Sequence, residues 1–328
     1  MNILVTGATG FIGKHLIQQL LQRGWNIRCL ARPTSQLPKE FVDQVEWVIG
    51  NLEDRSSLIK ACASIDAVIH LGGVIKARNA DTLYIVNVEG TRNLLGALEQ
   101  SGKSNARFIY ISSQAALGPA SNQRPLTEDD KPRPVSNYGK SKLEAEKIIL
   151  EYSDRIRSII IRPSVVYGPG DRESLAFFKM AKYHLNPKLG IQPQYINLVY
   201  VRDLIEIICL GLEKDINSGE IFNVNDGNSA GYRVSEVINC TARVLDTWTL
   251  PVFIPKPILK IVAILNGCIS KLFGYTSMYN SDKYHELSES YWICSSEKVQ
   301  TLIGHTPEYD ILKGFSITAK WYKEHQWL

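Results

Sequence analysis

The stretch MNILVTGATGFIG, residues 1–13, decides the fold, because a short apolar run leads directly into three spaced glycines. Residues 2–5 are predicted as a buried strand and residues 11–23 as an amphipathic helix. Gly7 permits a tight turn, Gly10 lets backbone N–H groups approach a pyrophosphate, and Gly13 lets the helix pack closely on the strand. Unpaired N–H groups at the helix N-terminus would then bind the phosphates. This combination predicts a dinucleotide site.

The sequence up to residue 167 continues this alternation of strand and helix. Strands are predicted at 26–31, 45–49, 67–71, 107–112 and 158–162, and helices at 54–62, 81–100 and 138–152. This rhythm predicts an α/β fold, a Rossmann doubly wound parallel sheet with a smaller C-terminal substrate-binding lobe. We expect a nucleotide-binding domain at 1–167, with 198–213 packed back on it. Residues 168–197 and 214–328 would form the lobe.

Several residues with useful chemistry follow the carboxyl ends of these predicted strands. They are Gly7, Arg32, Gly72, Ser113 and Pro163. In a parallel sheet these ends share one edge, and ligands bind beyond it, so the sequence predicts one shared site. His70 also stands at a strand end, but a lone histidine there is more often packed and hydrogen-bonded than catalytic.

Arg32 stands where a protein that binds NAD usually carries an acidic side chain for the ribose 2′-hydroxyl. A ribose 2′-phosphate suits the guanidinium of Arg32 and the hydroxyls of Thr34 and Ser35, with Arg28 nearby. These groups provide no carboxylate to accept hydrogen bonds from the ribose diol of NAD. The sequence therefore favours NADP over NAD as cofactor. The alternative is an exposed loop arginine in a protein that accepts both.

Tyr138 and Lys142 are four residues apart on a predicted helix, so their side chains share one face. A phenol with a pKa of about 10 is a poor base near neutrality, and a neighbouring ammonium would lower that pKa. Lys142 could also hold the nicotinamide ribose. Ser113 could orient the substrate oxygen, and Asn87 could support a water that relays protons to Lys142. We interpret these four residues as catalytic.

In these features the sequence resembles the extended short-chain dehydrogenases/reductases, the NAD-dependent epimerase/dehydratase family. The motifs that carry the resemblance are Gly7-Ala-Thr-Gly10-Phe-Ile-Gly13, His70-Leu-Gly-Gly73, Asn87-Val-Glu-Gly90-Thr, Ser112-Ser113, Tyr138-Gly-Lys-Ser-Lys142, Arg162-Pro163-Ser-Val-Val-Tyr167-Gly-Pro-Gly170 and Val201-Arg-Asp203. The family implies the catalytic roles given above, and a homodimer formed through the helices at 81–100 and 138–152. The cofactor-binding residues that we expect are Gly7, Thr9, Gly10, Phe11, Ile12, Gly13, Arg32, Asn51, Leu52, Leu71, Gly72, Gly73, Ser112, Tyr138, Lys142, Pro163, Val165 and Val166.

Departures from the family pattern narrow the subclass. Gln114 and Ala115 stand where 4,6-dehydratases carry an Asp-Glu pair, so water elimination is not expected. Asn51 replaces a frequent Asp, so adenine recognition would use an amide. Residues 190–197 lack the arginine that nucleotide-sugar members usually carry there. The sequence looks most like the dihydroflavonol reductase and 3β-hydroxysteroid dehydrogenase branch, with hopanoid-associated sugar epimerase-like proteins close by.

Composition excludes other classes of function. A net charge of +4 with scattered Lys and Arg is no footprint of nucleic-acid binding. Six widely spaced cysteines without a CxxC pair indicate reduced thiols and no metal site. A strand that starts at residue 2 leaves no presequence, so a cytoplasmic protein is expected. The apolar segment 254–273 is too interrupted to span a bilayer, but it could contact a membrane surface or cover a substrate pocket. Core packing explains it equally well.

The sequence thus predicts an NADP-preferring oxidoreductase that interconverts a secondary alcohol and a ketone of a small-molecule substrate, with Tyr138 as general acid/base. The apolar segment 254–273 would suit a lipophilic substrate. Two alternatives stay open: a nucleotide-sugar epimerase with tightly bound NAD, and a non-catalytic cofactor sensor on the same fold.

Overall fold

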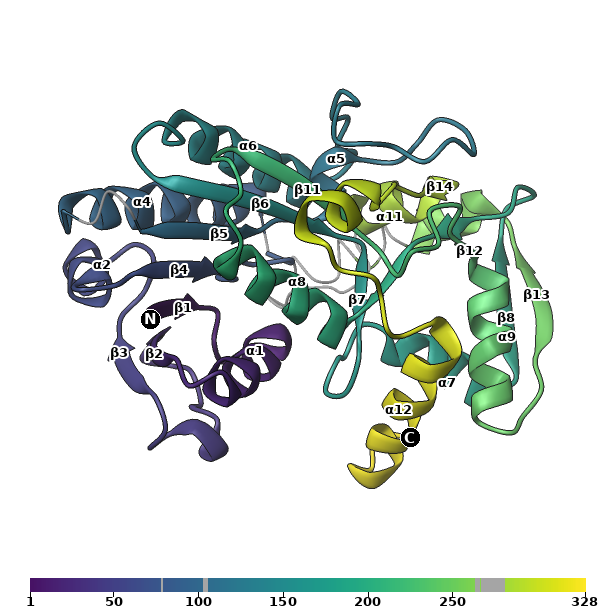
Figure 1. The fold of residues 1–328 in the computed structure, drawn as a ribbon. Coiled ribbons are helices and arrows are strands. Elements are labelled where there is room, and N and C mark those ends of the chain that lie inside the picture. The colour runs from purple at the N-terminus through teal and green to yellow at the C-terminus, as the bar shows by residue number, and fades with distance from the viewer. Residues whose placement is uncertain (78, 103–105, 263–265, 267–280) are drawn as a thin grey trace.

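The computed structural model describes residues 1–77, 79–102, 106–262, 266 and 281–328. Seven strands form one parallel sheet with the order β11-β6-β5-β4-β1-β2-β3 (Figure 1). The strands are β1 Asn2–Thr6, β2 Asn26–Ala31, β3 Glu46–Ile49, β4 Ala67–His70, β5 Arg107–Ile111, β6 Arg157–Pro163 and β11 Glu220–Val224. The chain reverses its direction of travel across the sheet between β1 and β4, which opens a crevice at their carboxyl ends. The predicted doubly wound fold is confirmed.

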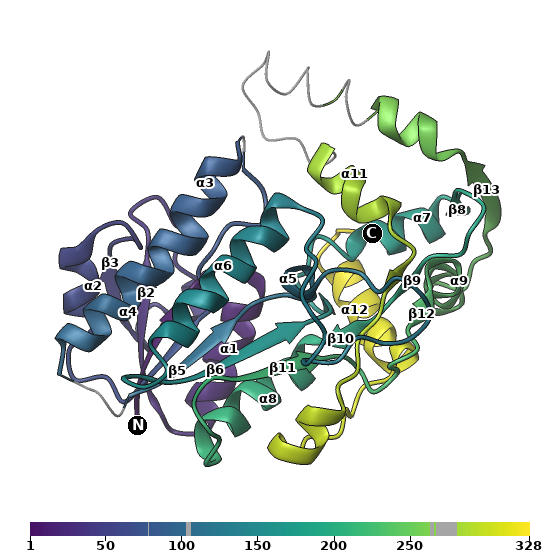
Figure 2. The same ribbon diagram turned by 90° about the horizontal axis from the view of Figure 1, so that it is seen from above.

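Helices cover both faces of this sheet (Figures 1 and 2). On one face lie α1 Phe11–Gln22 and α8 Val201–Glu213; on the other lie α2 Arg55–Cys62, α4 Gly90–Gln100 and α6 Asn137–Glu151. Side chains of β1 alternate between the two cores, since Ile3 and Val5 join the core of α1 and α8, while Leu4 joins the other. Such two-sided burial explains why the strands read as continuous apolar runs.

The helix predicted over 81–100 is not uniform. It consists of α3 Ala80–Tyr84, one π-helical turn at Ile85–Glu89, and α4. Asn87 lies in the π-helical turn, a local irregularity that is often found at functional sites. Short helices flank the core at α5 Gln114–Leu117 and in the turns Lys39–Phe41 and Val299–Ile303.

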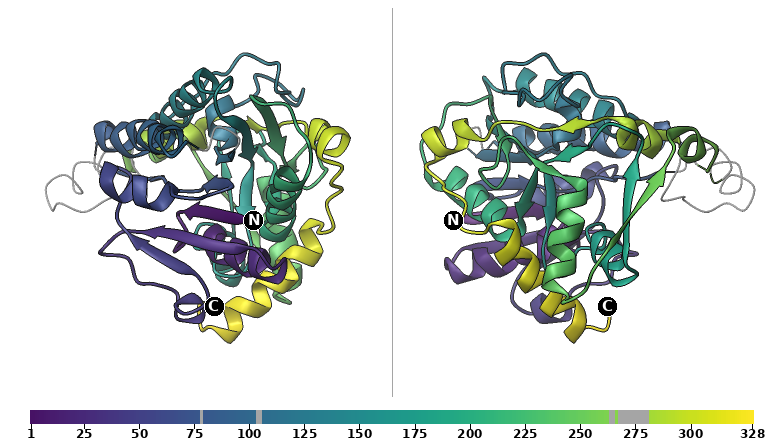
Figure 3. Two further views of the ribbon diagram at one scale, coloured as in Figure 1. Left: turned by 60° about the vertical axis from the view of Figure 1, so that its left-hand side comes forward. Right: turned by 90° about the vertical axis from the view of Figure 1, so that its right-hand side faces the viewer.

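The C-terminal lobe packs against one end of the sheet (Figure 3). Its strands pair as β10–β7, β12–β9–β14 and β13–β8, and an aromatic core that includes Tyr167, Phe178 and Phe315 holds it together. The strands are β7 Val165–Tyr167, β8 Leu185–Leu189, β9 Tyr195–Ile196, β10 Leu198–Tyr200, β12 Tyr232–Arg233, β13 Leu250–Ile254 and β14 Tyr291–Trp292. The helices are α7 Leu175–Lys182, α9 Val234–Val244, α11 Ser281–Ser288 and α12 Ile311–Glu324.

The structure corrects the predicted place of β11 and describes only part of the segment 254–273. β11, which the predicted division placed in the lobe, pairs with β6 as the edge strand of the large sheet, because its apolar residues complete that sheet's cores. Of the segment 254–273, residues 263–265 and 267–273 lie outside the described part, as does Cys268. The other five cysteines are free thiols. None of the helices within the described ranges is both long and apolar enough to cross a bilayer.

Candidate active site

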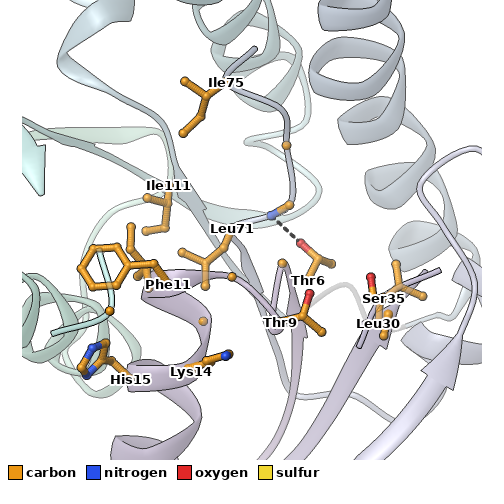
Figure 4. Close-up of a pocket in the computed structure, with 18 of the residues that line it drawn as sticks. Thr6, Thr9, Phe11, Lys14, His15, Leu30, Ser35, Leu71, Ile75 and Ile111 are labelled. Atoms are coloured by element: carbon orange, nitrogen blue, oxygen red, sulfur yellow. Dashed lines mark hydrogen bonds between the residues drawn. The ribbon is translucent and has the colours of Figure 1, made fainter. Parts of the chain in front are cut away.

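A cavity of about 1340 Å³ opens at the carboxyl ends of the central strands, and Figure 4 shows part of its lining. The cavity extends along α1 to the C-terminal helix. It lies at the crevice between β1 and β4, where this topology binds its ligands. Sixteen of the predicted site residues line it: Gly7, Thr9, Gly10, Phe11, Ile12, Gly13, Arg32, Asn51, Leu52, Leu71, Gly72, Gly73, Asn87, Ser112, Tyr138 and Lys142.

The glycine turn has the geometry that a phosphate cradle requires. Gly7 has φ +72°, and Gly10 N–H donates to the Gly7 carbonyl at 3.0 Å. A Cβ at Gly13 would stand 2.4 Å from that same carbonyl oxygen, so only glycine lets α1 approach β1 so closely. No side chain caps the N-terminus of α1, which leaves its first N–H groups facing the cavity for an anion.

The second predicted contact with the cofactor comes from the end of β2. Arg32 and Ser35 line the cavity, whereas the Arg28 guanidinium bonds the carbonyls of Ala61 and Ala63 and pairs with Glu46. Arg28 is therefore occupied elsewhere. Asn51 also lines the cavity, but its side-chain oxygen accepts the N–H groups of the two residues that follow Leu52, which leaves the amide NH₂ for a ligand.

Tyr138 and Lys142 lie one turn apart at the start of α6, and both face the cavity. The Lys142 ammonium donates to the Ile111 carbonyl at 2.7 Å and stands 4.1 Å from the centre of the Tyr110 ring. Burial lowers the pKa of Lys142 to about 7, and the nearby Glu146 carboxylate opposes this shift. At neutral pH the lysine is thus close to its midpoint.

Burial also raises the pKa of Tyr138, to about 12; hydrogen bonding with Ser113 opposes the shift, and the Glu286 carboxylate adds to it. The expectation that the lysine would lower this pKa is therefore wrong for the structure described here. Loss of solvent at the phenol is the largest influence on its pKa. The Lys142 ammonium is directed at the Ile111 carbonyl.

Ser113 and three other predicted residues do not line the cavity. The Ser113 hydroxyl caps α5 by accepting the Ala115 N–H at 3.1 Å, and it also hydrogen-bonds with the Tyr138 phenol. Pro163 is buried in the sheet beside β11, and Val165 and Val166 form β7 with β10.

Two buried networks support the site. Gly72 N–H donates to the Thr6 hydroxyl at 3.0 Å; Thr6 bonds His70 Nδ1 at 2.6 Å; and His70 Nε2 bonds Thr91 at 3.0 Å. Thr91 donates to the Asn87 carbonyl, so Nε2 must carry the imidazole hydrogen. His70 is packed and hydrogen-bonded, as its sequence context predicts.

The second network lies beneath Lys142. Glu146 accepts two hydrogen bonds from Arg162, at 3.0 and 2.6 Å, and one from the Ser112 hydroxyl. All three side chains are buried. Asn87 is similarly fixed, since its amide bonds the Val74 backbone in both directions and donates to Ser141 at 2.9 Å.

The sequence did not point to the far end of the cavity. His15 lines it there and bonds the Pro169 carbonyl at 2.7 Å. Trp321, His325 and Trp327, from α12 and the tail that follows it, complete the lining. No local motif marks these residues, because only the folding of the chain brings its end against α1.

Comparison with known proteins assigns the chain to a family. The model of the NAD dependent epimerase/dehydratase family matches residues 3–225. The chain belongs to this family. That span includes the glycine turn and the Tyr138–Lys142 pair, which line the cavity, and it ends just after β11.

Relatives within the epimerase/dehydratase family differ in reaction. The chain is 29% identical to a ceramide reductase of Caulobacter vibrioides, over 99% of this chain and 96% of that protein. It is 26% identical to a sterol-4-alpha-carboxylate 3-dehydrogenase of Dictyostelium discoideum, over 95% and 98%. It is 31% identical to an N-acetyl-alpha-D-glucosaminyl-diphospho-ditrans,octacis-undecaprenol 4-epimerase of Escherichia coli O157:H7, over 69% and 67%. The expected likeness to the dehydrogenase branch is confirmed.

Proposed function

We propose that the protein is an NADP-preferring oxidoreductase that reduces a ketone of a lipophilic small molecule to a secondary alcohol, or catalyses the reverse reaction. The observation that carries the proposal is the convergence of Tyr138, Lys142 and the glycine turn on one cavity. The names of two relatives that span nearly the whole chain, a ceramide reductase and a sterol dehydrogenase, support a lipophilic substrate.

A bound nicotinamide would supply or accept the hydride. Tyr138 then gives its phenolic proton to the carbonyl oxygen of the substrate during reduction, and the raised pKa keeps that proton in place at neutral pH. Protonated Lys142 has three N–H donors, of which the Ile111 carbonyl uses one. The remaining donors can hold ribose hydroxyls beside the phenol.

The preference for NADP is part of this proposal. Arg32 and Ser35 line the cavity at the place expected for a ribose 2′-phosphate, and Arg32 suits a phosphate better than a diol. Glu40 and Glu53 line the same cavity and could accept hydroxyls instead, so the choice between the cofactors is decided by measuring both affinities.

An epimerase is the second candidate, and one relative supports it, since the undecaprenol-linked 4-epimerase is 31% identical over about two thirds of the chain. The two candidate functions predict different bound cofactors and different affinities for UDP in the purified protein. An epimerase should carry tightly held NAD and bind UDP, whereas the oxidoreductase should exchange NADPH freely and have no affinity for UDP. A homodimer through α3–α4 and α6, which the family implies, is also proposed.

Replacement of Tyr138 tests the chemistry directly. Tyr138→Phe should lower kcat by at least about 10²-fold, because the variant keeps the ring but loses the transferable proton. NADPH affinity should change little. Tyr152→Phe, at the other end of α6, is the matched control and should keep full turnover. Unchanged turnover in Tyr138→Phe would remove this residue from the mechanism.

A further inference from the structure

One edge strand of the lobe is exposed within the part of the chain that the structure describes. β13 pairs with β8, and β8 packs on α7 and α9, whereas Leu250, Pro251, Val252 and Phe253 of β13 are all exposed. Helical residues 256–262 follow and project from the body of the lobe (Figure 2). We call Ile191, Phe253, Ile258, Ile261 and Val262 the β13 face.

The β13 face is more apolar than an isolated surface should be. The exposed fractions are 57% for Phe253, 51% for Ile258, 57% for Ile261 and 94% for Ile191. Ile191 belongs to the same surface, because Gly190 N–H bonds the Ile254 carbonyl at 3.0 Å. A hydrophobic edge strand invites unwanted association unless a partner covers it, so clustered exposure of this kind marks a contact surface.

Charge on the surrounding segments indicates the kind of partner. Residues 182–191 and 243–262 contain five cations, Lys182, Lys188, Arg243, Lys256 and Lys260, against the single acidic residue Asp246. This excess equals the net charge of +4 of the entire chain, so the remaining sequence is balanced. Lys256 is engaged with the Ser288 carbonyl, whereas Lys182, Lys188, Arg243 and Lys260 are exposed.

We propose that the β13 face docks this protein on an anionic lipid bilayer. Apolar side chains among cations enter the boundary between headgroups and acyl chains, while the cations bind anionic headgroups. A second copy fits less well, since a two-fold symmetric contact would bring the same cations together. Nucleic acid would use the cations but would leave Phe253 and Ile258 in water.

The β13 face is also connected to the candidate active site. Lys256 bonds the Ser288 carbonyl at the end of α11, and Asp282 at its start accepts the Asn137 N–H at 2.7 Å. α11 therefore joins the projecting helix to the turn that presents Tyr138. The inference that docking delivers a lipophilic substrate rests on the proposed function. The proposal of docking on a bilayer is independent of that function.

Sedimentation with lipid vesicles tests the docking without any assay of turnover. The wild-type protein should bind vesicles of phosphatidylcholine and phosphatidylglycerol, and should bind vesicles of phosphatidylcholine alone far less. The double variant Ile258→Glu/Ile261→Glu should lose at least about tenfold in binding, because two apolar side chains no longer enter the bilayer. Lys188→Glu/Lys260→Glu should abolish the preference for the anionic lipid.

The control is Leu312→Glu, a change at a 45% exposed leucine on α12, and it should bind as the wild type does. Absence of wild-type binding, or full binding by the Ile258→Glu/Ile261→Glu variant, overturns the proposal. So does a wild-type dimer in solution that the same variant dissociates, because a second copy would then cover the face. Turnover of a water-soluble ketone, measured separately, shows whether the proposed function fails independently of docking.

Discussion

Burial shifts the pKa values of the two ionisable side chains at the start of α6 in opposite directions. It raises the pKa of Tyr138 to about 12 and lowers that of Lys142 to about 7, so both are driven toward the neutral form. The phenol is therefore held as a proton donor, which suits the reduction of a carbonyl. Glu146 is the buried group that favours charged Lys142, and Arg162 holds it in place.

Lys142 should make the stability of the protein depend on pH in a defined window. Its pKa is 10.5 ordinarily and about 7 in the fold, so the unfolded chain binds more protons between these values and the free energy of unfolding rises with pH. Lys142→Met removes this effect. When the pH falls from about 10 to 7, the free energy of unfolding of the variant should rise relative to that of the wild type by more than about 1 kcal/mol.

Urea unfolding at both pH values measures this difference. Lys140→Met, at an exposed position of the same helix, is the control for loss of a surface lysine. Stability curves of the wild type and Lys142→Met that run parallel across the window would contradict the prediction.

Arg32 and Arg28 form a matched pair for testing cofactor choice. Arg32→Ala should weaken NADPH binding by about 10-fold or more and NADH binding by much less, because a charge-assisted contact to the 2′-phosphate is lost. Arg28→Ala should leave the NADPH/NADH ratio unchanged, since Arg28 bonds the carbonyls of Ala61 and Ala63 instead. Calorimetric titration gives both affinities. Equal losses for the two cofactors in Arg32→Ala would refute the 2′-phosphate assignment.

At the scale of elements, the contact between β1 and α1 depends on Gly13. Gly13→Ala would place a methyl group 2.4 Å from the Gly7 carbonyl oxygen and 2.7 Å from Ala8 Cα, both of them backbone atoms that cannot yield cheaply. We expect a loss of at least about 2 kcal/mol in stability, together with weaker dinucleotide binding.

Gly96→Ala is the natural comparison, because none of the described residues comes within 4 Å of an added methyl group at this position in α4. It should stabilise the protein by about 0.5–1 kcal/mol through helix propensity. Thermal unfolding should therefore move the two variants in opposite directions. A Gly13→Ala protein as stable as the wild type would show that α1 can shift away from β1.

The link between α11 and α6 makes a prediction at the same scale. Asp282 accepts the N–H groups of Asn137 and Tyr138, at 2.7 and 3.4 Å, so Asp282→Ala should loosen the turn that presents the phenol. We expect a loss of about 1 kcal/mol in stability and a several-fold fall in kcat.

Asp54→Ala removes a comparable cap from α2, where the carboxylate accepts the N–H groups of Ser56 and Ser57. It should cost similar stability and leave kcat unchanged. Steady-state kinetics beside thermal unfolding separates the two effects. If both variants kept full kcat, α11 would have no role in positioning Tyr138.

At the scale of the whole molecule, local patterns predicted the large sheet well. Its strands are buried on both faces, so each appears as a short apolar run, and glycines or polar residues end it at the ligand edge. Asp54 likewise caps α2 where the sequence placed that helix start. The alternation of strands and helices with right-handed crossovers predicts the doubly wound arrangement of this sheet.

Contacts between distant segments could not be predicted in this way. His15 and Trp321 line one cavity although they are far apart in sequence, and no motif marks either. Pro163 and Ser113 do stand at strand ends, but Pro163 pairs with β11, Ser113 caps α5, and neither residue lines the cavity. Burial of Tyr138, which reverses its expected pKa shift, also depends on surroundings that no single segment specifies.

The chain of hydrogen bonds from Gly72 through His70 to Asn87 has a consequence for acid tolerance. Burial lowers the pKa of His70 to about 3, so the imidazole stays uncharged across all ordinary acidity. Both threonine partners keep their donor and acceptor roles over that range. The backbone at Gly72, which would contact a dinucleotide, is thus held by hydrogen bonds to a histidine that stays neutral at moderately acidic pH. As the pH falls moderately, other groups should therefore be protonated and inactivate the protein well before this hydrogen-bond network is lost.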